Sequence, residues 1–144
     1  QLDLFAESID IAPTILEFLD IEQPDQFQGV SLLGTIRESA TAPRKTEIYF
    51  EKDYRSSGMR AEGMDPDRCL LWVVRDDHYK YIQFADESTP PLLFDLQTDP
   101  SELHNVADDP GHRDVLLRYC QKLLRWRMGH EDQRMEHWAS AYRS

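Results

Sequence analysis

The most constraining feature of this 144-residue sequence is a pair of apolar segments separated by two aspartates. The first segment, CLLWVVR at 69–75, is rich in β-branched and aromatic residues, and the second, HYKYIQF at 78–84, alternates two sets of bulky side chains. Such side chains favour a pleated surface, and Asp76 with Asp77 can form the tight turn between them. The sequence therefore predicts a β-hairpin that carries bulky residues on both faces and needs a covering layer on each.

Two further segments extend this sheet, and a long helical pattern follows it. EIYFE at 47–51 and LLFDL at 92–96 have the composition of strands. From His112 to at least Met128, apolar residues recur at helical spacing, namely Val115, Leu116, Tyr119, Cys120, Leu123, Leu124 and Trp126. Gly129 is expected to break or kink this helix before a second helix at 130–142. We expect an α+β fold, with a small antiparallel β-sheet of about four strands packed by a long C-terminal helix.

The first 40 residues are predicted to be mainly helical. Ser8 or Asp10 can cap a helix that holds Pro13 in its first turn, and five apolar residues follow on it: Ile11, Ile15, Leu16, Phe18 and Leu19. A short second helix is predicted from Ser31 to about Glu38. The predicted organisation is a helical segment at 1–40, a subdomain of sheet and helix at 41–128, and a basic helical tail at 129–144.

The charge of the chain restricts its partners. The formal net charge is −11, which argues against non-specific binding to nucleic acid or to an anionic membrane. From residue 111 to residue 144, however, seven Lys or Arg face four Asp or Glu. A basic tail on an acidic body suggests docking within the subunit or against a neighbouring copy, in a homo-oligomer. A solvated basic helix explains the same pattern equally well.

The chain shows no targeting or spanning segment in its sequence. No apolar run approaches the roughly 20 residues that cross a bilayer, and no signal-peptide pattern opens it. Because the first residue is Gln1 and an apolar pattern begins soon after it, we expect the native start to lie upstream. The two cysteines, Cys69 and Cys120, lie among apolar neighbours and are expected to pack as buried free thiols in a reducing, cytoplasmic compartment.

A group near the C-terminus has the residue types of a metal site. His130, Glu131, Asp132 and His137 all carry side chains that bind metals. His130 and His137 are seven residues apart, which is about 10 Å along a helix. Two imidazoles on one metal need a spacing of three or four residues, so we favour a solvated or subunit-contacting face.

The predicted hairpin tip has the residue types of a catalytic base. Asp76, Asp77 and His78 could form a base with an orienting carboxylate, but aspartates at a hairpin tip are explained by the turn itself. Asp99 and Asp109 each precede a proline, which is typical of helix caps, and Asn105 could close the first of these turns in the left-handed conformation. No nucleophile motif or phosphate-binding glycine loop is present. We therefore expect no catalytic, cofactor-binding or metal-ligating residue in this chain.

Residues 55–67 form a polar stretch with serine, glycine and proline, and are predicted to be a long loop. Long polar loops on a rigid scaffold often carry recognition, so this loop is a candidate for one wall of a substrate pocket. A surface loop without a binding role explains the composition as well.

Four segments resemble the C-terminal part of the sulfatase family, within the alkaline-phosphatase superfamily. They are SIDIAPTILEFL at 8–19, QGVSLL at 28–33, RDDHYKYI at 75–82 and LFDLQTDPSELHN at 93–105. Gln28 stands where the family pattern has Asp. The order and spacing of the four segments are similar to those of the family from Glu7 to Trp126. The tail that begins at Trp126 resembles the branch of phosphonate monoester hydrolases and arylsulfatases.

The resemblance implies a parent protein that hydrolyses sulfate, phosphonate or phosphate esters with a divalent metal ion and a formylglycine nucleophile. It also implies that residues 1–40 belong to the end of the parent's catalytic α/β domain. The family's nucleophile and metal ligands precede the region matched at Asp10, and neither Cys69 nor Cys120 lies in the formylglycine motif. We therefore expect a non-catalytic fragment that completes the fold of the parent and packs against its N-terminal catalytic domain. The alternative is an oligomerisation module that acts through the C-terminal helix and tail.

Overall fold

The computed structural model describes residues 4–24, 27–37, 44–53, 65 and 68–130. The chain divides into two compact units, Gln1–Ile48 and Tyr49–Ser144. The first unit contains a 3₁₀ turn, η1 (Ser8–Asp10), and the helices α1 (Ile11–Phe18) and α2 (Leu33–Ile36). Pro13 lies in the first turn of α1, as predicted, where the helix does not require its missing N–H.

Helix α2 is shorter than the sequence predicts, because side chains bind the backbone amides before it. The N–H groups of Leu32 and Leu33 donate to the hydroxyl oxygens of Thr14 and Ser31, at 2.9 and 3.2 Å. These bonds hold Leu32 as the cap of α2, and the helix begins only at Leu33.

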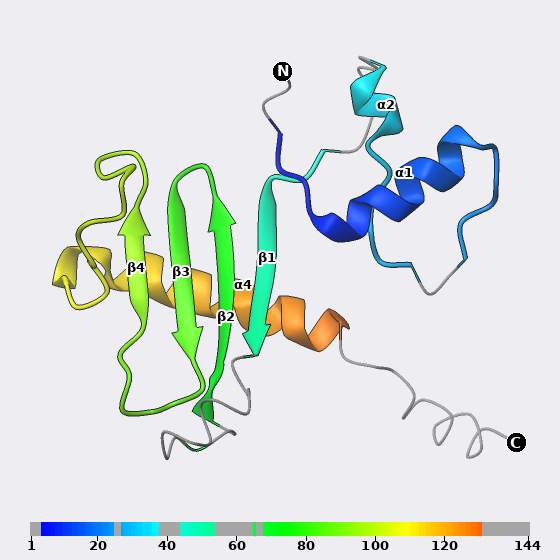
Figure 1. The fold of residues 1–144 in the computed structure, drawn as a ribbon. Coiled ribbons are helices and arrows are strands. Elements are labelled where there is room, and N and C mark those ends of the chain that lie inside the picture. Colours follow the sequence, from blue (N-terminus) through cyan, green and yellow to red (C-terminus); the bar gives the residue numbers. More distant parts are fainter. Residues whose placement is uncertain (1–3, 25–26, 38–43, 54–64, 66–67, 131–144) are drawn as a thin grey trace, which may run out of the picture. The chain divides into compact units, whose positions relative to one another are not determined.

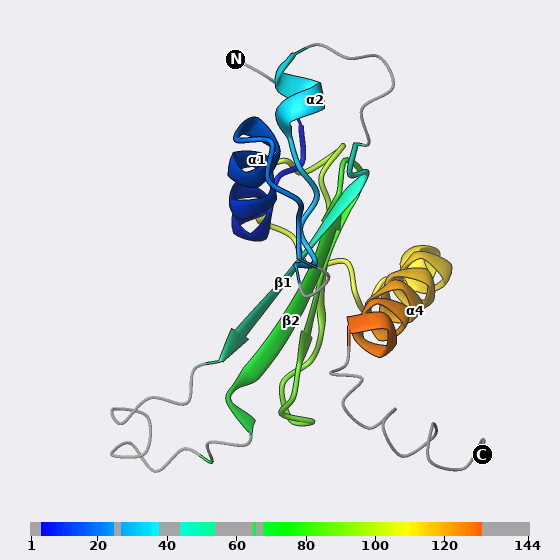
Figure 2. The same ribbon diagram turned by 90° about the vertical axis from the view of Figure 1, so that its right-hand side faces the viewer.

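The second unit is a four-stranded sheet with one long helix, as the sequence predicts. The strands β1 (Glu47–Asp53), β2 (Leu70–Asp76), β3 (Tyr79–Phe84) and β4 (Leu92–Asp95) lie in sequence order (Figure 1). The pairs β2–β3 and β3–β4 are antiparallel. A 3₁₀ turn, η3 (Pro110–His112), leads into α4 (Arg113–His130), which lies along one face of the sheet (Figure 2).

The core of this unit lies between the sheet and α4. Val74, Tyr81 and Leu93 are partners across β2, β3 and β4, and all three are buried. Ala107 and the α4 residues Tyr119 and Leu123 complete the buried cluster. The alternation of side chains along each strand therefore directs one set toward α4, and this set supplies the core.

Two details of the predicted elements are wrong. The hairpin turn contains Asp77 and His78, whereas Asp76 is the last residue of β2, because its Oδ1 accepts the amides of His78 and Tyr79 at 2.9 and 3.0 Å. Helix α4 continues through Gly129 to His130 without the predicted break. The second helix predicted at 130–142 falls outside the described residues from 131 onward, as does most of the loop predicted at 55–67.

Helix α4 also buries fewer apolar residues than predicted. Tyr119 and Leu123 are buried and Trp126 packs against the core, but Cys120 and Leu124 are exposed. The sheet covers only one side of the helix, so a second apolar stripe remains on the other side. This outer stripe consists of Leu117, Leu124 and Met128.

Candidate functional site

Two carboxylates with little or no solvent exposure, Asp10 and Asp76, organise the polar interior, one in each unit. In the first unit the side chain of Asp10 is fully buried. Its Oδ1 accepts hydrogen bonds from the amide of Val30 and from Lys45 Nζ, both at 2.8 Å, and its Oδ2 accepts the amide of Glu7 at 2.8 Å. Lys45 Nζ also contacts the carboxylate of Glu7. Every oxygen of the Asp10 carboxylate therefore has a partner.

The start of α1 is joined to the segment at 28–33 by a second set of contacts. The Thr14 hydroxyl donates to the Asp10 carbonyl at 2.6 Å and accepts the Leu32 amide at 2.9 Å. Gly29 lies directly against the backbone of Ile9, where a Cβ atom would come within 2.0 Å of the Ile9 carbonyl oxygen. Three residues, Asp10, Thr14 and Gly29, thus hold the start of α1 against the segment at 28–33. We call these three residues the N-terminal lock.

The charges of the lock stabilise one another. Burial alone would raise the pKa of the Asp10 carboxyl, but the bonds from Lys45 and from two backbone amides hold the pKa below its ordinary value. Burial alone would lower the pKa of Lys45, but its two carboxylate partners raise it. Both groups are therefore charged at neutral pH, and neither is suited to exchange a proton in a reaction.

In the second unit, Asp76 connects the hairpin turn to α4. Its Oδ1 accepts the two turn amides, and its Oδ2 accepts the hydroxyl of Tyr119 and Lys122 Nζ, the latter at 2.9 Å. Burial opposes the ionised form of Asp76, but these four bonds lower its pKa to about 2. We call Asp76, Tyr119 and Lys122 the hairpin anchor. Asp76, which the sequence placed at the hairpin tip, therefore has a structural role.

The other residues considered for catalysis do not converge with the hairpin anchor. Asp77 and His78 are both exposed. Asp109 caps η3 by accepting the Gly111 amide at 2.9 Å, as predicted. Asp99 accepts the amide of His104 at 2.7 Å.

The turn after Asp99 closes differently from the prediction. Glu102, not Asn105, adopts the left-handed conformation, with φ of 55°. Asn105 instead uses its side-chain oxygen to accept the amides of Leu93 and Ala107, at 2.8 and 3.1 Å. The side chain of Asn105 is thus occupied in holding β4, and Glu102 pairs with Lys80.

The predicted burial of both cysteines is wrong. Cys120 is exposed on α4, although its thiol lies against the side chain of Tyr81 in the sheet. Cys69 is partly exposed, and its thiol donates to the Asp65 carbonyl at 3.2 Å. Both are free thiols, as predicted.

The roles of Lys45, Tyr119 and Lys122 could not be predicted from the sequence. Lys45 lies 35 residues from Asp10, and the partners of Asp76 on α4 lie 43 and 46 residues from it. An i, i+4 pattern would have revealed a helical pair, but no comparable pattern marks contacts over these distances. Tyr119 was predicted only as a core residue.

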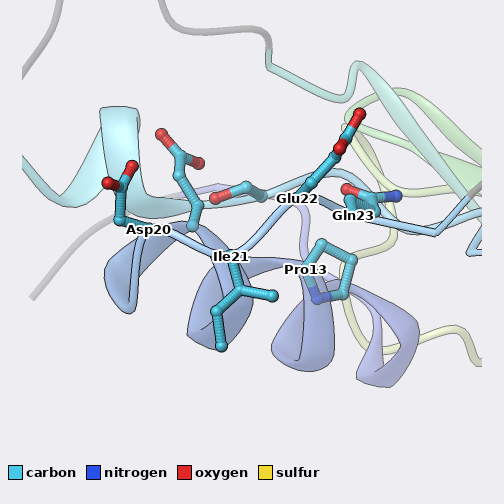
Figure 3. Close-up of a pocket in the computed structure, with 7 residues that line it drawn as sticks. Pro13, Asp20, Ile21, Glu22 and Gln23 are labelled. Atoms are coloured by element: carbon cyan, nitrogen blue, oxygen red, sulfur yellow. The ribbon is translucent and has the colours of Figure 1, made fainter.

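An open cavity of about 480 Å³ lies beside α1. Pro13, Glu17, Asp20, Ile21, Glu22, Gln23 and Ser31 line it. Figure 3 shows Asp20 at one end of this group and Glu22 with Gln23 at the other. Three carboxylates and no cationic side chain face the cavity, so it would repel a sulfate or phosphate ester.

A cleft of about 260 Å³ lies between the end of β1 and the end of α4. Its lining includes Glu51, Lys52 and Asp53 of β1, Trp72 of β2, and Arg127 of α4. The Arg127 guanidinium lies 5.0 Å from the centre of the Trp72 ring, over its face. The cleft thus combines an aromatic surface with two cations and two carboxylates, and it borders the end of β1 at Asp53 and the start of β2 at Leu70.

The described residues do not assemble a metal site. No group of three or more His, Cys, Asp or Glu side chains in this part of the chain is placed to hold a metal ion. The metal site considered for His130 and residues 131–137 cannot be placed, since only His130 is described; its Nδ1 lies 2.8 Å from the Trp126 carbonyl oxygen. Among the described helices, none has the length and apolar character needed to cross a membrane.

Residues 1–129 match the family model described as N-sulphoglucosamine sulphohydrolase, C-terminal. The multifunctional alkaline phosphatase superfamily protein PehA of Trinickia caryophylli is 40% identical over 141 residues, which cover 95% of this chain and 27% of PehA. Arylsulfatase K of Xenopus laevis is 31% identical over 108 residues, covering 74% of this chain and 20% of that protein.

The fold is also similar to solved structures of larger hydrolases. The phosphonate monoester hydrolase of Agrobacterium radiobacter superimposes with a TM-score of 0.80 and 34% sequence identity, over 92% of this chain and 27% of that one. The chain therefore spans about a quarter of the length of the relatives that it matches.

Proposed function

Because the chain belongs to the C-terminal domain family of N-sulphoglucosamine sulphohydrolase, within the sulfatases of the alkaline phosphatase superfamily, we propose that it is the non-catalytic C-terminal domain of an ester hydrolase. The whole protein would cleave sulfate, phosphonate or phosphate esters. The observation that carries the proposal is that the two best-formed polar centres, around Asp10 and Asp76, are saturated by partners within the chain.

The donor groups of this chain do not fit the family's divalent metal ion or its formylglycine. The oxygens of Asp10 are bound by two amides and a lysine, and those of Asp76 by two amides, a tyrosine and a lysine. A metal ion would have to displace these donors, including the cation. The thiols of Cys69 and Cys120 contact the Asp65 carbonyl and the Tyr81 side chain, and neither contact involves the two carboxylates. The metal and the nucleophile would therefore come from a different part of the protein.

The structural role of the domain has support from a large apolar surface on α1. Ile11, Ile15 and Phe18 lie on one side of this helix and are 58%, 52% and 66% exposed. Ile9 and Leu19 extend the surface, at 49% and 56% exposure. A contiguous apolar patch of this kind marks a contact surface. We propose that the catalytic part of the protein, which accounts for most of the length of the relatives, covers it.

The finer proposal is that residues 55–67 form one wall of the substrate pocket. The cleft around Trp72 and Arg127 supports it, because it lies beside the ends of this segment and holds the Arg127 guanidinium over the Trp72 ring. That guanidinium could pair with the negative charge of a sulfate or phosphate ester, although Glu51 and Asp53 also line the cleft.

Parallel assays test the main proposal. Aryl sulfate, phosphate monoester and phosphonate monoester would be offered to this 144-residue chain and to the full-length gene product, with metal supplied to both. We expect turnover by the full-length product alone, and the ester that it prefers identifies the class. Hydrolysis by the 144-residue chain would contradict the proposal, and inactivity of both proteins on all three esters would contradict the hydrolase assignment.

A further inference from the structure

A second cavity, of about 150 Å³, adjoins the cleft between the end of β1 and the end of α4. It is lined by residues at the start of β2 and the end of β3, namely Leu70, Leu71, Trp72, Gln83, Phe84 and Ala85. Leu70 and Trp72 also line the cleft, so the two cavities share a wall. A ligand that occupies both cavities would therefore pass across the side chains of these two residues.

This second cavity, which we call the apolar pocket, is lined mainly by hydrophobic side chains. The amide group of Gln83 in its wall is already bound, because its Oε1 accepts the Tyr81 hydroxyl and its Nε2 donates to the Phe84 carbonyl at 3.0 Å. Walls of leucine, tryptophan and phenylalanine favour a hydrophobic ligand. A cavity of about 150 Å³ with such walls has room for a group of the size of a benzene ring.

The adjoining cleft supplies a cation beside the shared wall. The Arg127 guanidinium lies over the ring of Trp72 and forms no ion pair within the described part of the chain. The planar guanidinium is well suited to bind the oxygens of a sulfate, phosphate or phosphonate group. Glu51 and Asp53 line the same cleft, so a doubly charged group would be repelled more strongly than a singly charged one. Together the two cavities fit a singly charged anion that carries a hydrophobic group.

We infer that the apolar pocket binds the organic group of the ester, while Arg127 holds an oxygen of the charged group beside it. The inference rests on the proposed hydrolase function and narrows the substrate to singly charged esters of a hydrophobic group, not of a sugar. Sugar hydroxyls would lose their water partners in the apolar pocket without gaining new ones. Leu70 and Trp72 are then specificity-determining residues, because they form the wall between the two parts of the ligand.

The first test measures binding without turnover, by calorimetry on the full-length protein. Benzenesulfonate and methanesulfonate are the probes, because both are singly charged and neither has an ester bond. Benzenesulfonate should bind about tenfold or more tightly, since only its ring fills the apolar pocket.

A variant of the pocket wall gives this test its control. Ala85 is exposed, so Ala85→Leu should fold normally, fill part of the apolar pocket and weaken benzenesulfonate by about tenfold. The affinity for methanesulfonate should not change. Ala6→Leu, the same change at an exposed alanine of the first unit, should leave both affinities unchanged. Equal affinities for the two sulfonates, no detectable binding of benzenesulfonate, or an Ala85→Leu variant that binds it normally would overturn the inference.

The second test uses turnover of a phenyl ester and a methyl ester by the full-length protein. Ala85→Leu should raise KM about tenfold for the phenyl ester alone, whereas Arg127→Gln should raise KM for both, because both carry the charged group. Binding of benzenesulfonate as expected, without turnover of any ester, would contradict the hydrolase proposal and leave the pocket assignment intact. Turnover in which Ala85→Leu changes KM equally for both esters, or for neither, would contradict the pocket assignment alone.

Discussion

The two buried carboxylates, Asp10 and Asp76, have the same environment built from different parts of the chain. Each accepts two backbone amides and one lysine, and Asp76 accepts a tyrosine hydroxyl in addition. A carboxylate placed in this way stabilises the fold strongly while ionised, because a buried charge without its partners is costly. At the residue scale, therefore, the electrostatics of this domain serve its stability.

Asp76→Asn should destabilise the protein in a pH-dependent way. The pKa of Asp76 is lowered from 3.8 to about 2, so its stabilising effect is present above pH 3.8 and is lost as the pH falls through 2. Asp76 is 13% exposed, and the shift corresponds to about 2 kcal/mol of unfolding free energy at neutral pH. Urea unfolding of both proteins between pH 7 and pH 2 measures this difference, which should shrink toward the acid end.

Asp77→Asn is the matched control for that series, because Asp77 is the exposed neighbour in the turn. It should change the unfolding free energy by less than about 0.5 kcal/mol at every pH. An Asp76→Asn effect that is equal at neutral and acid pH would contradict the assigned role of the charge.

At the scale of elements, the N-terminal lock shows why a short helix is stable here. Helix α1 has only eight residues, which is too short to be stable in isolation. The bonds of Asp10 and Thr14 to the segment at 28–33 replace the contacts that a longer helix would make. Gly29 makes them possible, because its missing side chain lets the two backbones meet.

Gly29→Ala should therefore destabilise the protein by about 2 kcal/mol or more, since the new methyl group would displace the backbone of Ile9. Gly129→Ala is the control, because a Cβ there meets no atom within 4 Å and the residue lies inside α4. This second change should be neutral or stabilise the protein by up to about 1 kcal/mol. Thermal unfolding of the two variants beside the wild type gives both values, and equal destabilisation by the two alanines would contradict the lock.

At the scale of the whole molecule, two apolar surfaces are exposed to solvent, one on α1 and one on α4. They belong to different compact units and carry different charge. Acidic residues, Glu17, Asp20 and Glu22, lie in or just after α1, whereas α4 contains five Lys or Arg and one Asp. We assign the α1 surface to the catalytic part of the protein.

Phe18→Asp tests this assignment. In the full-length gene product it should lower the stability by about 2 kcal/mol, because a charge would be buried in the contact with the catalytic part. In the 144-residue chain Phe18 is 66% exposed, so the same change should alter stability by less than about 0.5 kcal/mol. Melting temperatures of the four proteins measure this, and an equal effect in both lengths would show that the α1 surface has no such partner.

Much of the local structure was predictable from the sequence. The hairpin strands, β1, β4, the Pro13 helix start and the Asp109 cap each depend on periodicity or turn chemistry within a few residues. The resemblance to the sulfatase family could also be recognised from the sequence, because its motifs are short segments that follow one another in a fixed order along the chain. The errors at Asp76 and Asn105 arose where a side chain binds a segment that the local pattern does not include.

The sequence by itself thus determined the α+β class, the hairpin at its centre and the membership of the sulfatase family. Only the tertiary structure decided that Lys45 pairs with Asp10, that Tyr119 and Lys122 meet Asp76, and that Leu117, Leu124 and Met128 of α4 are exposed. The physical reason is one of range. Dihedral preferences and side-chain periodicity act over a few residues, whereas partners for buried charges and cover for apolar faces depend on the path of the whole chain.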